Sequence, residues 1–386
     1  MHKGPLAGIK VLEIAGLGPA PCAGMMLADM GAEVILVERK VANTNAARLT
    51  ADEENNAVMF INRGKSSIQV DLKKPAGTDL LLRLVEQVDV LIEGFRPGVM
   101  ERLGLGPDVC LARNPRLVYG RMTGWGQTGP LAQAAGHDPN YAALSGALWY
   151  GGSPQDVPNA PLTLVGDIGG GTMVLAWGIL CAVIHAQKTG EGQVVDAAIT
   201  DGSAYLSSLL WVMYNSSQLK NTRGSSWADG GAPWNATYAC ADGKFVTVCA
   251  LEPQFYQLLL TLLDQENNPL FAKQWDKSIW PAAKAELESL FLTQTRDHWC
   301  QLLEGTDACF GPVLDFSEAP QHEHNIARET FLDIDGVIQP APAPKLSAFQ
   351  PTVGVPPRPG EHIDAILSGA GLSETEISDL KEAGVV

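Results

Sequence analysis

The sequence lacks an excess of positive charge. It carries 27 Lys and Arg residues against 43 Asp and Glu, which gives a formal net charge of −16. This balance argues against nucleic acid as a partner, because nucleic-acid-binding domains present a basic surface. The basic residues are nevertheless unevenly spread, with 15 of the 27 within residues 1–121. An acidic chain with a local basic cluster indicates an anionic small molecule bound at one place.

Paired cysteines and long apolar runs are missing too. The seven cysteines are scattered singly with no CxxC spacing, which is typical of reduced thiols and predicts a cytoplasmic protein. The N-terminal residues show neither the apolar core nor the cleavage site of a signal peptide. The most apolar helical stretch, residues 172–186, is 15 residues long and is short for a membrane span. We therefore expect a buried core helix there and no membrane partner.

A third glycine is absent from the opening stretch VLEIAGLGPAPCAG, residues 11–24. An apolar run ends there in Gly16-x-Gly18, and a helical pattern follows. The dinucleotide fingerprint G-x-G-x-x-G needs a third glycine so that helix and strand pack closely, and Pro21 occupies that place. Proline suits the first turn of a helix. The stretch therefore predicts a βαβ unit and argues against a nicotinamide-dependent dehydrogenase.

Apolar runs alternate with helical patterns over residues 1–125. The runs IKVLEI, EVILVE, SIQVDL, VDVLIEGF and RLVYGRMTG are typical of strands, and LLLRLVEQ is typical of a helix between two of them. Such alternation predicts an α/β fold with a parallel, doubly wound sheet. We expect a further strand at QVVDAAI and a helix at residues 203–214. The polar connector that follows indicates a domain boundary.

Residues 236–330 have a different pattern. YACADGKFVTVCA predicts a hairpin with its Asp-Gly pair as the turn, and three helical patterns follow, PQFYQLLLTLL, AAKAELESLFL and RDHWCQLLE. Residues 339–360 then hold seven prolines in 22 positions, which predicts an extended arm without a core of its own. The chain ends in a short helix that we expect to be capped by Ser373-x-x-Glu376.

Three residues are candidates for acid–base chemistry, namely His137, Asp167 and Glu252. Each follows an apolar segment and is expected at the end of an element, where a side chain can face a cleft. Structural roles also explain them, and they are favoured for each residue taken singly, because most polar residues at element ends are caps. Asp167 and Glu252 could cap the helices that follow them, and His137 could be an ordinary turn histidine. The spacing alone leaves these alternatives open.

A set of motifs in one fixed order gives the chain a family resemblance. They are LADMGAEVILVER, RGKSSIQVDLK, EGFRPGVMERLGLGP, GRMTGWGQTGP, GHDPNYAALSG, GDIGGGTM, DGGAPWNATY, EPQFY and EGTDACFGPV. On these motifs the chain resembles, over essentially its full length, the CaiB/BaiF family of class III CoA-transferases, and in particular its racemase branch. The resemblance implies an α/β, Rossmann-like large domain, residues 1–224 with 331–386 returning to it, and a smaller α+β domain at 225–330. Residues 339–360 would be the Pro-rich connecting arm, and the protein would be an interlocked homodimer.

The resemblance also implies a reaction. His137 and Asp167 would be the catalytic pair of a racemase that interconverts (2R)- and (2S)-2-methylacyl-CoA thioesters by proton transfer through an enolate. Glu252 would be an accessory carboxylate supplied by the partner subunit. These residue types suit the chemistry, because inversion needs one proton carrier on each face of the enolate. A histidine, with a reference pKa of about 6.5, serves as acid or base. Main-chain N–H groups near Asp138 are candidate donors to the enolate oxygen if a helix begins there.

An alternative stays open within the same family. A class III CoA-transferase would use Asp167 as a nucleophile. The resemblance favours the racemase, because transferases usually lack the histidine of the GHD motif and carry a longer glycine run where this chain has DGGAPW. A coenzyme A-binding module without catalysis would need the three candidate residues replaced, and all three are present.

The resemblance places the coenzyme A part of the substrate against the basic cluster. Arginine forks and lysine ammonium groups suit a 3′-phosphate and a pyrophosphate, although each charge could equally be a solvated surface group. Arg63 and Lys65 are further candidates. We expect no separate cofactor and no metal. The residues implied to contact coenzyme A are Arg39, Val70, Asp71, Leu72, Lys73, Arg96, Arg102, Gly136, Asp138, Pro139, Asn140 and Tyr141.

Overall fold

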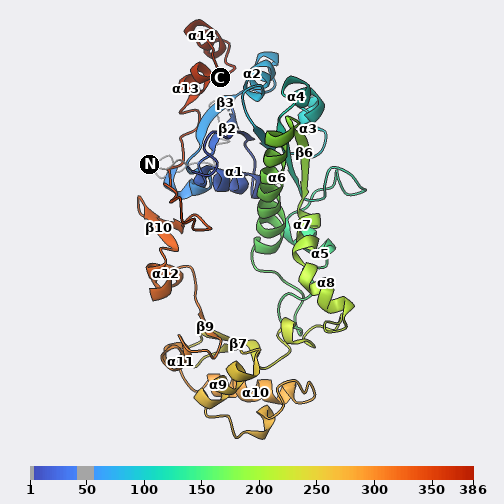
Figure 1. Ribbon diagram of the computed structural model, residues 1–386, viewed down its shortest axis with the longest axis vertical. Helices are drawn as coiled ribbons and strands as arrows, with labels where there is room; N and C mark the ends of the chain where they lie inside the picture. Colours follow the sequence, from blue (N-terminus) through green and yellow to red (C-terminus); the bar gives the residue numbers. More distant parts are fainter. Residues whose placement is uncertain (1–3, 41–55) are drawn as a thin grey trace. The chain divides into compact units, whose positions relative to one another are not determined.

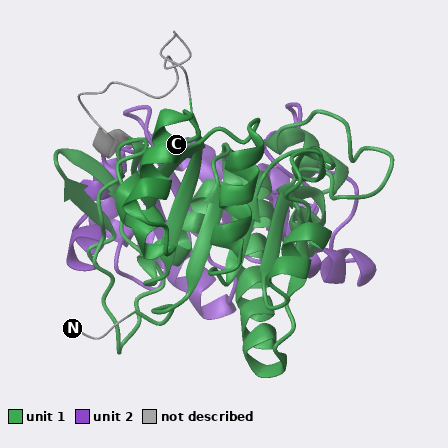
Figure 2. Cartoon of the chain, turned by 90° about the horizontal axis from the view of Figure 1, so that it is seen from above, with its two compact units in different colours: residues 1–147, 161–206, 329–386 green, residues 148–160, 207–328 purple. Residues whose placement is uncertain are grey.

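The computed structural model describes residues 4–40 and 56–386 (Figure 1). Two units of the chain each have their own core (Figure 2). The first unit comprises the described residues up to Ala147 together with Pro161–Leu206 and Glu329–Val386. The second unit comprises Leu148–Ala160 and Ser207–Arg328. Each unit is described below by itself.

A six-stranded parallel sheet forms the centre of the first unit, with strand order β3-β2-β1-β4-β5-β6. This is the strand order of the doubly wound dinucleotide-binding fold. The order along the sheet reverses between β1 and β4, while all the strands stay parallel. All the strands expected in this part of the sequence are confirmed. Their bounds are β1 Lys10–Ile14, β2 Glu33–Arg39, β3 Ser66–Val70, β4 Val90–Glu93, β5 Val118–Thr123 and β6 Gln193–Ala198.

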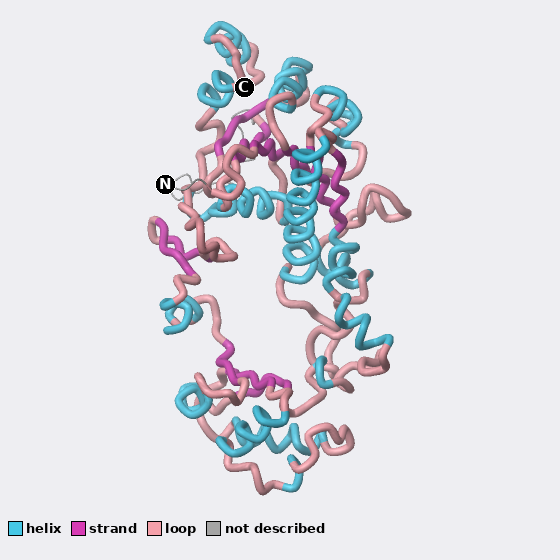
Figure 3. Tube along the Cα trace, viewed as in Figure 1, coloured by secondary structure: helices cyan, strands magenta, loops and turns pink. Residues whose placement is uncertain are grey.

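Helices cover both faces of this sheet (Figures 1 and 3). One face packs against α2, α13 and α14 through residues such as Leu81 and Leu367, and the other packs against α1 and α6 through residues such as Ala23 and Ile179. Apolar strands buried on both faces are typical of a parallel sheet. The helices of this unit are α1 Pro19–Asp29, α2 Pro75–Val85, α3 Val99–Arg102, α4 Pro107–Arg113, α5 Asp138–Leu144, α6 Val174–Thr189, α7 Ile199–Leu206, α13 Ile363–Gly369 and α14 Glu374–Glu382, with a 3-10 segment at Asn56–Asn62.

The C-terminal part of the chain is fastened to the first unit. Strands β10 (Phe331–Ile334) and β11 (Val337–Pro340) form an antiparallel pair, and the proline-rich segment after them, residues 341–360, contains no helix and no strand apart from one isolated bridge. Its end is held at β3, where the Ser67 hydroxyl accepts the Gly360 N–H at 2.7 Å. The capping box predicted at Ser373 is confirmed, since its Oγ accepts the Glu376 N–H at 3.3 Å.

The helix expected at residues 172–186 is longer than the sequence indicated. A π-helical segment, Leu164–Met173, runs directly into α6. The Ile168 N–H donates to the Thr163 carbonyl five residues earlier, at 3.0 Å. The run Leu164–Thr189 therefore has 26 residues and contains an 18-residue stretch of mean hydropathy 1.7, enough to cross a bilayer by length and composition. A core helix of a globular domain passes the same test, and the face of α6 toward the sheet is buried.

An antiparallel sheet of order β7-β8-β9 organises the second unit. The predicted hairpin is confirmed, with Asp242-Gly243 in the turn between β7 and β8. Helices pack on it around Trp234, Tyr238 and Phe291. The bounds are β7 Asn235–Ala239, β8 Phe245–Cys249, β9 Phe310–Val313, α8 Ser208–Asn215, α9 Pro253–Leu262, α10 Trp280–Phe291, α11 Arg296–Leu303 and α12 Glu323–Ala327, with 3-10 turns at Trp227–Asp229, Pro269–Phe271 and Ala319–Gln321.

The boundary between the units differs from the predicted division at residue 224. Residues 207–224 and the excursion 148–160 both belong to the second unit. The guanidinium of Arg223 links them, since it donates to the carbonyls of Gly151, Ser153 and Asp156 at 2.6–2.8 Å. The single helix expected at 203–214 is also wrong. It breaks at Ser207 into α7 and α8, so the division falls at that break.

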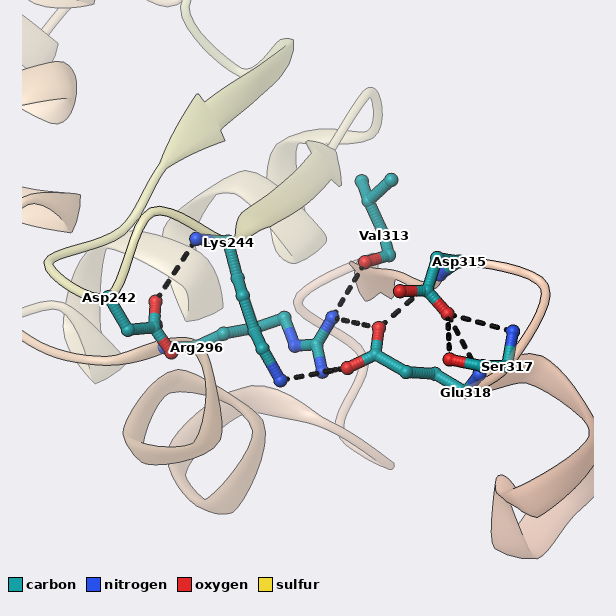
Figure 4. Close-up of polar contacts among 7 residues, drawn as sticks. All are labelled: Asp242, Lys244, Arg296, Val313, Asp315, Ser317 and Glu318. Atoms are coloured by element: carbon teal, nitrogen blue, oxygen red, sulfur yellow. Dashed lines mark hydrogen bonds and ion pairs between the residues drawn. The ribbon is translucent and has the colours of Figure 1, made fainter.

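A charged network holds the end of the second unit to its helices (Figure 4). The Glu318 carboxylate accepts from both Nη atoms of Arg296, at 2.6 and 2.8 Å, and from the Lys244 ammonium at 2.8 Å. Arg296 also donates to the Val313 carbonyl at 2.8 Å. These hydrogen bonds strongly lower the pKa of Glu318. The network therefore joins α11, the turn before β8 and the segment after β9.

Candidate functional site

The candidate residues of the first unit gather at the carboxyl edge of the parallel sheet. The turn Gly16–Gly18 follows β1, residues 94–98 follow β4, and residues 124–137 follow β5. Strands β1 and β4 are neighbours, and the strand order reverses between them. Ligands of open α/β sheets bind in the crevice outside the carboxyl ends of the strands at this point. The fold therefore brings these three turns to the position where a small molecule is expected.

His137 is held by its own main chain at the start of α5. It is the residue before the helix, in an extended conformation with φ −138° and ψ 175°, and its side chain is exposed. The Asn140 side-chain oxygen accepts the His137 N–H at 3.0 Å, and the Asn140 N–H donates to the His137 carbonyl at 2.8 Å. The hydroxyl of Tyr141 donates to the carbonyl of Gly136. The GHDPNY motif thus fixes the backbone that presents the imidazole.

Asp167 is not the simple helix cap that the sequence also allowed. It lies inside the π-helical segment and is partly buried. A Cβ atom placed on Gly18 would lie 3.7 Å from its Oδ2, so the carboxylate faces the turn after β1. Segments of π-helix occur frequently at functional sites. The position of Asp167 is therefore set by the Gly16–Gly18 turn as well as by its own helix.

The Asp167 pKa is raised, and the causes locate its neighbours. Burial is the main cause, the charge of Asp138 adds to it, and the charge of His137 opposes it. His137 and Asp167 therefore lie within electrostatic reach of each other. Tyr141 responds to the same surroundings, because burial and the Asp167 charge raise its pKa while Arg96 lowers it. Arg96 follows β4, so the basic cluster reaches this group.

Asp138 is turned toward the protein. Its side chain is buried, with 6% of the residue exposed. Its Oδ1 accepts the Asp167 N–H at 2.8 Å, and a Cβ atom on Gly166 would lie 2.3 Å from the same oxygen. Asp138 is one of the predicted coenzyme A contacts. The structure directs its carboxylate to the π-helix, which leaves its main chain for a ligand.

Glu252 belongs to the second unit. It is exposed and directly precedes α9, with Pro253 as the first helical residue. Its carbonyl accepts the Tyr256 N–H at 2.9 Å, whereas its side chain makes no capping hydrogen bond. Its carboxylate is therefore not used to cap the helix, as the structural alternative required. Of the three acid–base candidates, the structure brings together His137 and Asp167, both in the first unit.

The residues expected to contact coenzyme A differ in their exposure to solvent. Arg39 ends β2, Lys73 follows β3, and Arg96 and Arg102 follow β4, and all four side chains are exposed. Asp71 and Leu72 are partly exposed in the turn after β3, as Gly136 is before α5, while Pro139 and Asn140 are exposed in its first turn. Val70 lies in the core, so only its main chain is available to a ligand.

Arg63 and Lys65 do not present their charges to a ligand, and the interpretation of them as phosphate contacts is wrong. Arg63 is 2% exposed and pairs with Asp29 at 2.6 Å. Lys65 is 4% exposed and pairs with Glu13 at 2.8 Å. Both cations are used inside the first unit. The sequence carried no sign of these pairs, because the partners are 34 and 52 residues apart.

Metal ligands do not cluster in the described part of the chain. Within residues 4–40 and 56–386, no group of three or more His, Cys, Asp or Glu side chains is arranged to hold a metal ion. The basic residues at the sheet edge instead suit phosphate groups. What the described site offers chemically is an imidazole and a partly buried carboxylate within electrostatic reach, beside arginines.

An imidazole and a carboxylate at the ligand-binding edge of a doubly wound α/β domain are groups that an enzyme can use for acid–base chemistry. Residues 6–363 match CoA-transferase family III, and the chain belongs to this family. It is 43% identical over 384 residues to the alpha-methylacyl-CoA racemase of Mus musculus and 42% identical over 384 residues to that of Homo sapiens, in each case over 99% of this chain and 97% of the relative. A CAIB/BAIF family protein from Brucella suis has a similar structure, with a TM-score of 0.80 at 27% identity over 96% of this chain and 100% of that chain.

Proposed function

We propose that the protein is a racemase that interconverts (2R)- and (2S)-2-methylacyl-CoA thioesters. The observation that carries this proposal is the contact between the segments that bear His137 and Asp167, since Asp138, the residue after His137, accepts the Asp167 N–H at 2.8 Å. The two proton carriers thus come from different elements at the ligand edge of the sheet. The names of the mouse and human relatives support the choice of substrate class.

The reaction is a proton exchange at C2 of the acyl group. One of the two side chains removes the C2 proton, and the electron pair of the broken C–H bond moves into the thioester to form an enolate. The other side chain then returns a proton to the opposite face, which regenerates the thioester with inverted configuration. The roles exchange in the reverse direction. Two carriers on separate elements suit this chemistry, because each must approach a different face of the planar enolate.

The enolate oxygen needs a hydrogen-bond donor, and α5 begins at Asp138 as expected. The Asn140 and Tyr141 N–H groups already donate to the His137 carbonyl, and Pro139 has no N–H. The Asp138 N–H is therefore the group of this turn that we assign to the oxygen. A preorganised donor of this kind typically lowers the barrier by about 3–4 kcal/mol.

The exposed basic residues after β2, β3 and β4 would bind the phosphates of coenzyme A, which enters as part of the substrate. Arginine binds phosphate through paired, charge-assisted hydrogen bonds. Arg96 has a second role in this arrangement, because its charge acts on Tyr141 and hence lies beside the catalytic pair. These basic residues along the sheet edge would thus bind the substrate between its nucleotide and C2 of its acyl group.

Deuterium incorporation tests the proposal. A single enantiomer of 2-methylacyl-CoA, incubated with the protein in deuterated water without any acceptor, should gain deuterium at C2. The variants His137→Gln and Asp167→Asn should each slow exchange by about 10²–10⁴-fold, with opposite preference for the two enantiomers. His298→Gln, which alters an exposed histidine of α11, serves as the control and should exchange normally.

The same experiment distinguishes the transferase. That reaction would use the Asp167 carboxylate as a nucleophile on the thioester. If coenzyme A moves only when a second carboxylic acid is added, and C2 keeps its proton, the protein is a transferase and the racemase proposal fails.

We further propose that the protein acts as a homodimer in which Glu252 serves the site of the partner subunit. Co-expression of His137→Gln and Glu252→Gln chains tests this directly. If the site is shared, the mixed dimer contains one site with both residues intact, and activity returns. If Glu252 serves its own chain, both sites of the mixed dimer stay defective.

A further inference from the structure

We propose that Asp138 is a positioning residue for Asp167, which it orients through a hydrogen bond to the main chain and holds ready to carry a proton through the repulsion between the two carboxylates. This inference rests on the proposed function, because it assigns a role within the same proton transfer. Asp138 itself is not placed in contact with the reacting carbon.

The geometry of Asp138 is that of a built internal contact. The side chain is buried and its Oδ1 accepts the Asp167 N–H at 2.8 Å. A π-helix leaves main-chain N–H groups at its start without partners inside the helix, as any helix does, and Asp138 satisfies one of them. Gly166 gives the oxygen its space, because a Cβ atom at that position would lie only 2.3 Å away. Sequence neighbours of Asp167 are thus shaped around the Asp138 carboxylate.

The contact also joins the two candidate proton carriers. Asp138 directly follows His137, whose main chain is fixed by Asn140. The same short segment therefore presents the imidazole and orients the π-helix that bears Asp167. A displacement of either carrier costs rate steeply, because proton transfer requires close and aligned donor and acceptor atoms.

The electrostatic effect has a definite sign. A buried anion beside Asp167 disfavours its ionised form, and the Asp167 pKa is raised first by burial and then by Asp138. His137 acts in the opposite direction. The pKa of an aspartate must be raised above its ordinary range if the side chain is to donate a proton near neutral pH. Asp138 thus moves the pKa of Asp167 toward the range in which this side chain can act as both acid and base.

Other titratable groups lie on the elements that pack against the π-helical segment. Besides His137 and Asp138, α5 brings Tyr141. The remaining groups lie on the other elements packed against the segment, α1, α7, β6 and α6. They are Cys22, Asp29, Cys181, His185, Lys188, Asp196, Asp201 and Tyr205. Asp138 and His137 are the charges that shift Asp167.

Two substitutions separate position from charge. Asp138→Asn keeps a side-chain oxygen that can accept the Asp167 N–H but removes the negative charge. It should lower kcat less than Asp138→Ala does, while the limb of the pH profile of kcat/KM that belongs to Asp167 moves to lower pH by about one unit. Asp138→Ala loses the acceptor as well and should lower kcat by about tenfold or more.

Asp196→Asn is the matched control. The Asp196 carboxylate also accepts a main-chain N–H, from Gln127 at 3.1 Å, but it is not among the charges that shift Asp167. This variant should leave the pH profile in place. If Asp138→Asn has the wild-type profile, or if both variants shift it equally, Asp138 has only a structural role and the inference is overturned.

A readout independent of activity keeps the two proposals distinguishable. The carboxyl carbon of Asp167 can be titrated by NMR in the full-length protein and in Asp138→Asn, after circular dichroism has shown that both are folded. A lower Asp167 pKa in the variant supports the inference even if the wild-type protein exchanges no deuterium, which would overturn the proposed function alone. An unchanged pKa in a wild type that does racemise would overturn the inference alone.

Discussion

The ammonium of Lys65 lies 2.8 Å from a carboxylate oxygen of Glu13, and neither side chain is exposed to solvent. The same ammonium donates to the Pro21 carbonyl at 2.9 Å, in the first turn of α1. The second oxygen of Glu13 has no hydrogen-bond partner within the described residues. The pair therefore braces the strand and the helix that flank the Gly16–Gly18 turn, where Asp167 is also directed.

Removing one charge of this pair should be costly. Glu13→Gln leaves the Lys65 ammonium buried without an anion and should lower the free energy of unfolding by about 3–5 kcal/mol. Glu13→Gln combined with Lys65→Met removes both charges and should recover most of that loss. Urea denaturation measures both values.

An exposed pair supplies the comparison. Arg113 and Glu86 lie 2.9 Å apart with side chains about half exposed, so Glu86→Gln should cost less than about 1 kcal/mol. Equal losses for Glu13→Gln and Glu86→Gln would show that burial does not govern the energy of the Lys65–Glu13 pair.

Thr172 links the π-helix to the same turn. Its buried hydroxyl donates to the Pro19 carbonyl at 2.9 Å. Thr172→Val keeps the shape but removes the donor, and should cost about 1 kcal/mol of stability and slow deuterium exchange, because the segment that bears Asp167 loses an anchor. Thr172→Ser should restore both. Thr189→Val removes an exposed hydroxyl that bonds within α6, and a similar loss of exchange in that variant would remove the special role of Thr172.

The local sequence predicted most strands and helices of the fold, but it did not predict which strands pair with each other. Apolar alternation located β1 to β6 correctly, because each strand carries its own pattern. The pairing of β1 with β4 rather than only with β2 depends on contacts some 80 residues apart, for which the pattern has no signal. The sequence pattern did not predict strand β9, because its sequence FGPV contains glycine and proline, which are uncommon inside strands.

The candidate site shows the same division. The motifs made His137 and Asp167 candidates, and the structure brings the two residues into the same unit. The local pattern, however, predicted an ordinary helix start at Asp167, which lies inside a π-helical segment. The π-helical segment packs closely against α7, because a Cβ atom on Gly202 of α7 would lie 1.9 Å from the Gly170 carbonyl oxygen, and local sequence carries no signal of this contact. The role of Asp138 could not be inferred either, since its hydrogen bond spans 29 residues.

Glu318 predicts an acid-sensitive contribution to stability. Its pKa is strongly lowered by hydrogen bonds from Arg296 and Lys244 (Figure 4). A carboxyl group whose folded pKa lies below its unfolded value stabilises the protein above the unfolded pKa, about 4.3, and loses this effect as the pH falls further. Glu318→Gln should therefore lower the thermal midpoint at pH 7 and have a progressively smaller effect below pH of about 4.3. A difference that persists undiminished in acid would contradict this origin.

Arg223 should control the order of the excursion 148–160. Its guanidinium spans three carbonyls of that segment, which a lysine ammonium cannot do with the same geometry. Arg223→Lys should speed amide hydrogen exchange in residues 148–160 and reduce their protection by about 1.5–3 kcal/mol, the range for hydrogen bonds to a charged group. Lys220→Ala changes a nearby exposed cation and should not. Equal exchange in both variants would mean that other contacts fix the segment.

An exposed aromatic pair tests the proposed homodimer. Trp177 on α6 and Tyr205 on α7 are 56% and 64% exposed, and their rings stack with centroids 6.1 Å apart. Met173, the last residue of the π-helical segment, and Ile184 on α6 extend the apolar surface, at 49% and 51% exposed. Contiguous apolar surface of this kind marks interaction sites, and in a homodimer we expect the second copy to cover it.

Trp177→Glu places a charge at the centre of that surface and should shift the protein toward the monomer, as measured by sedimentation equilibrium. Val109→Glu alters an exposed apolar residue of α4 and provides the matched control, which should leave the mass unchanged. Because the proposed site needs Glu252 of a second subunit, racemisation by Trp177→Glu should fall with dilution over the same concentration range as dissociation. A Trp177→Glu protein that stays dimeric, or a monomer that keeps full activity, would separate this surface from the assembly that the catalytic proposal requires.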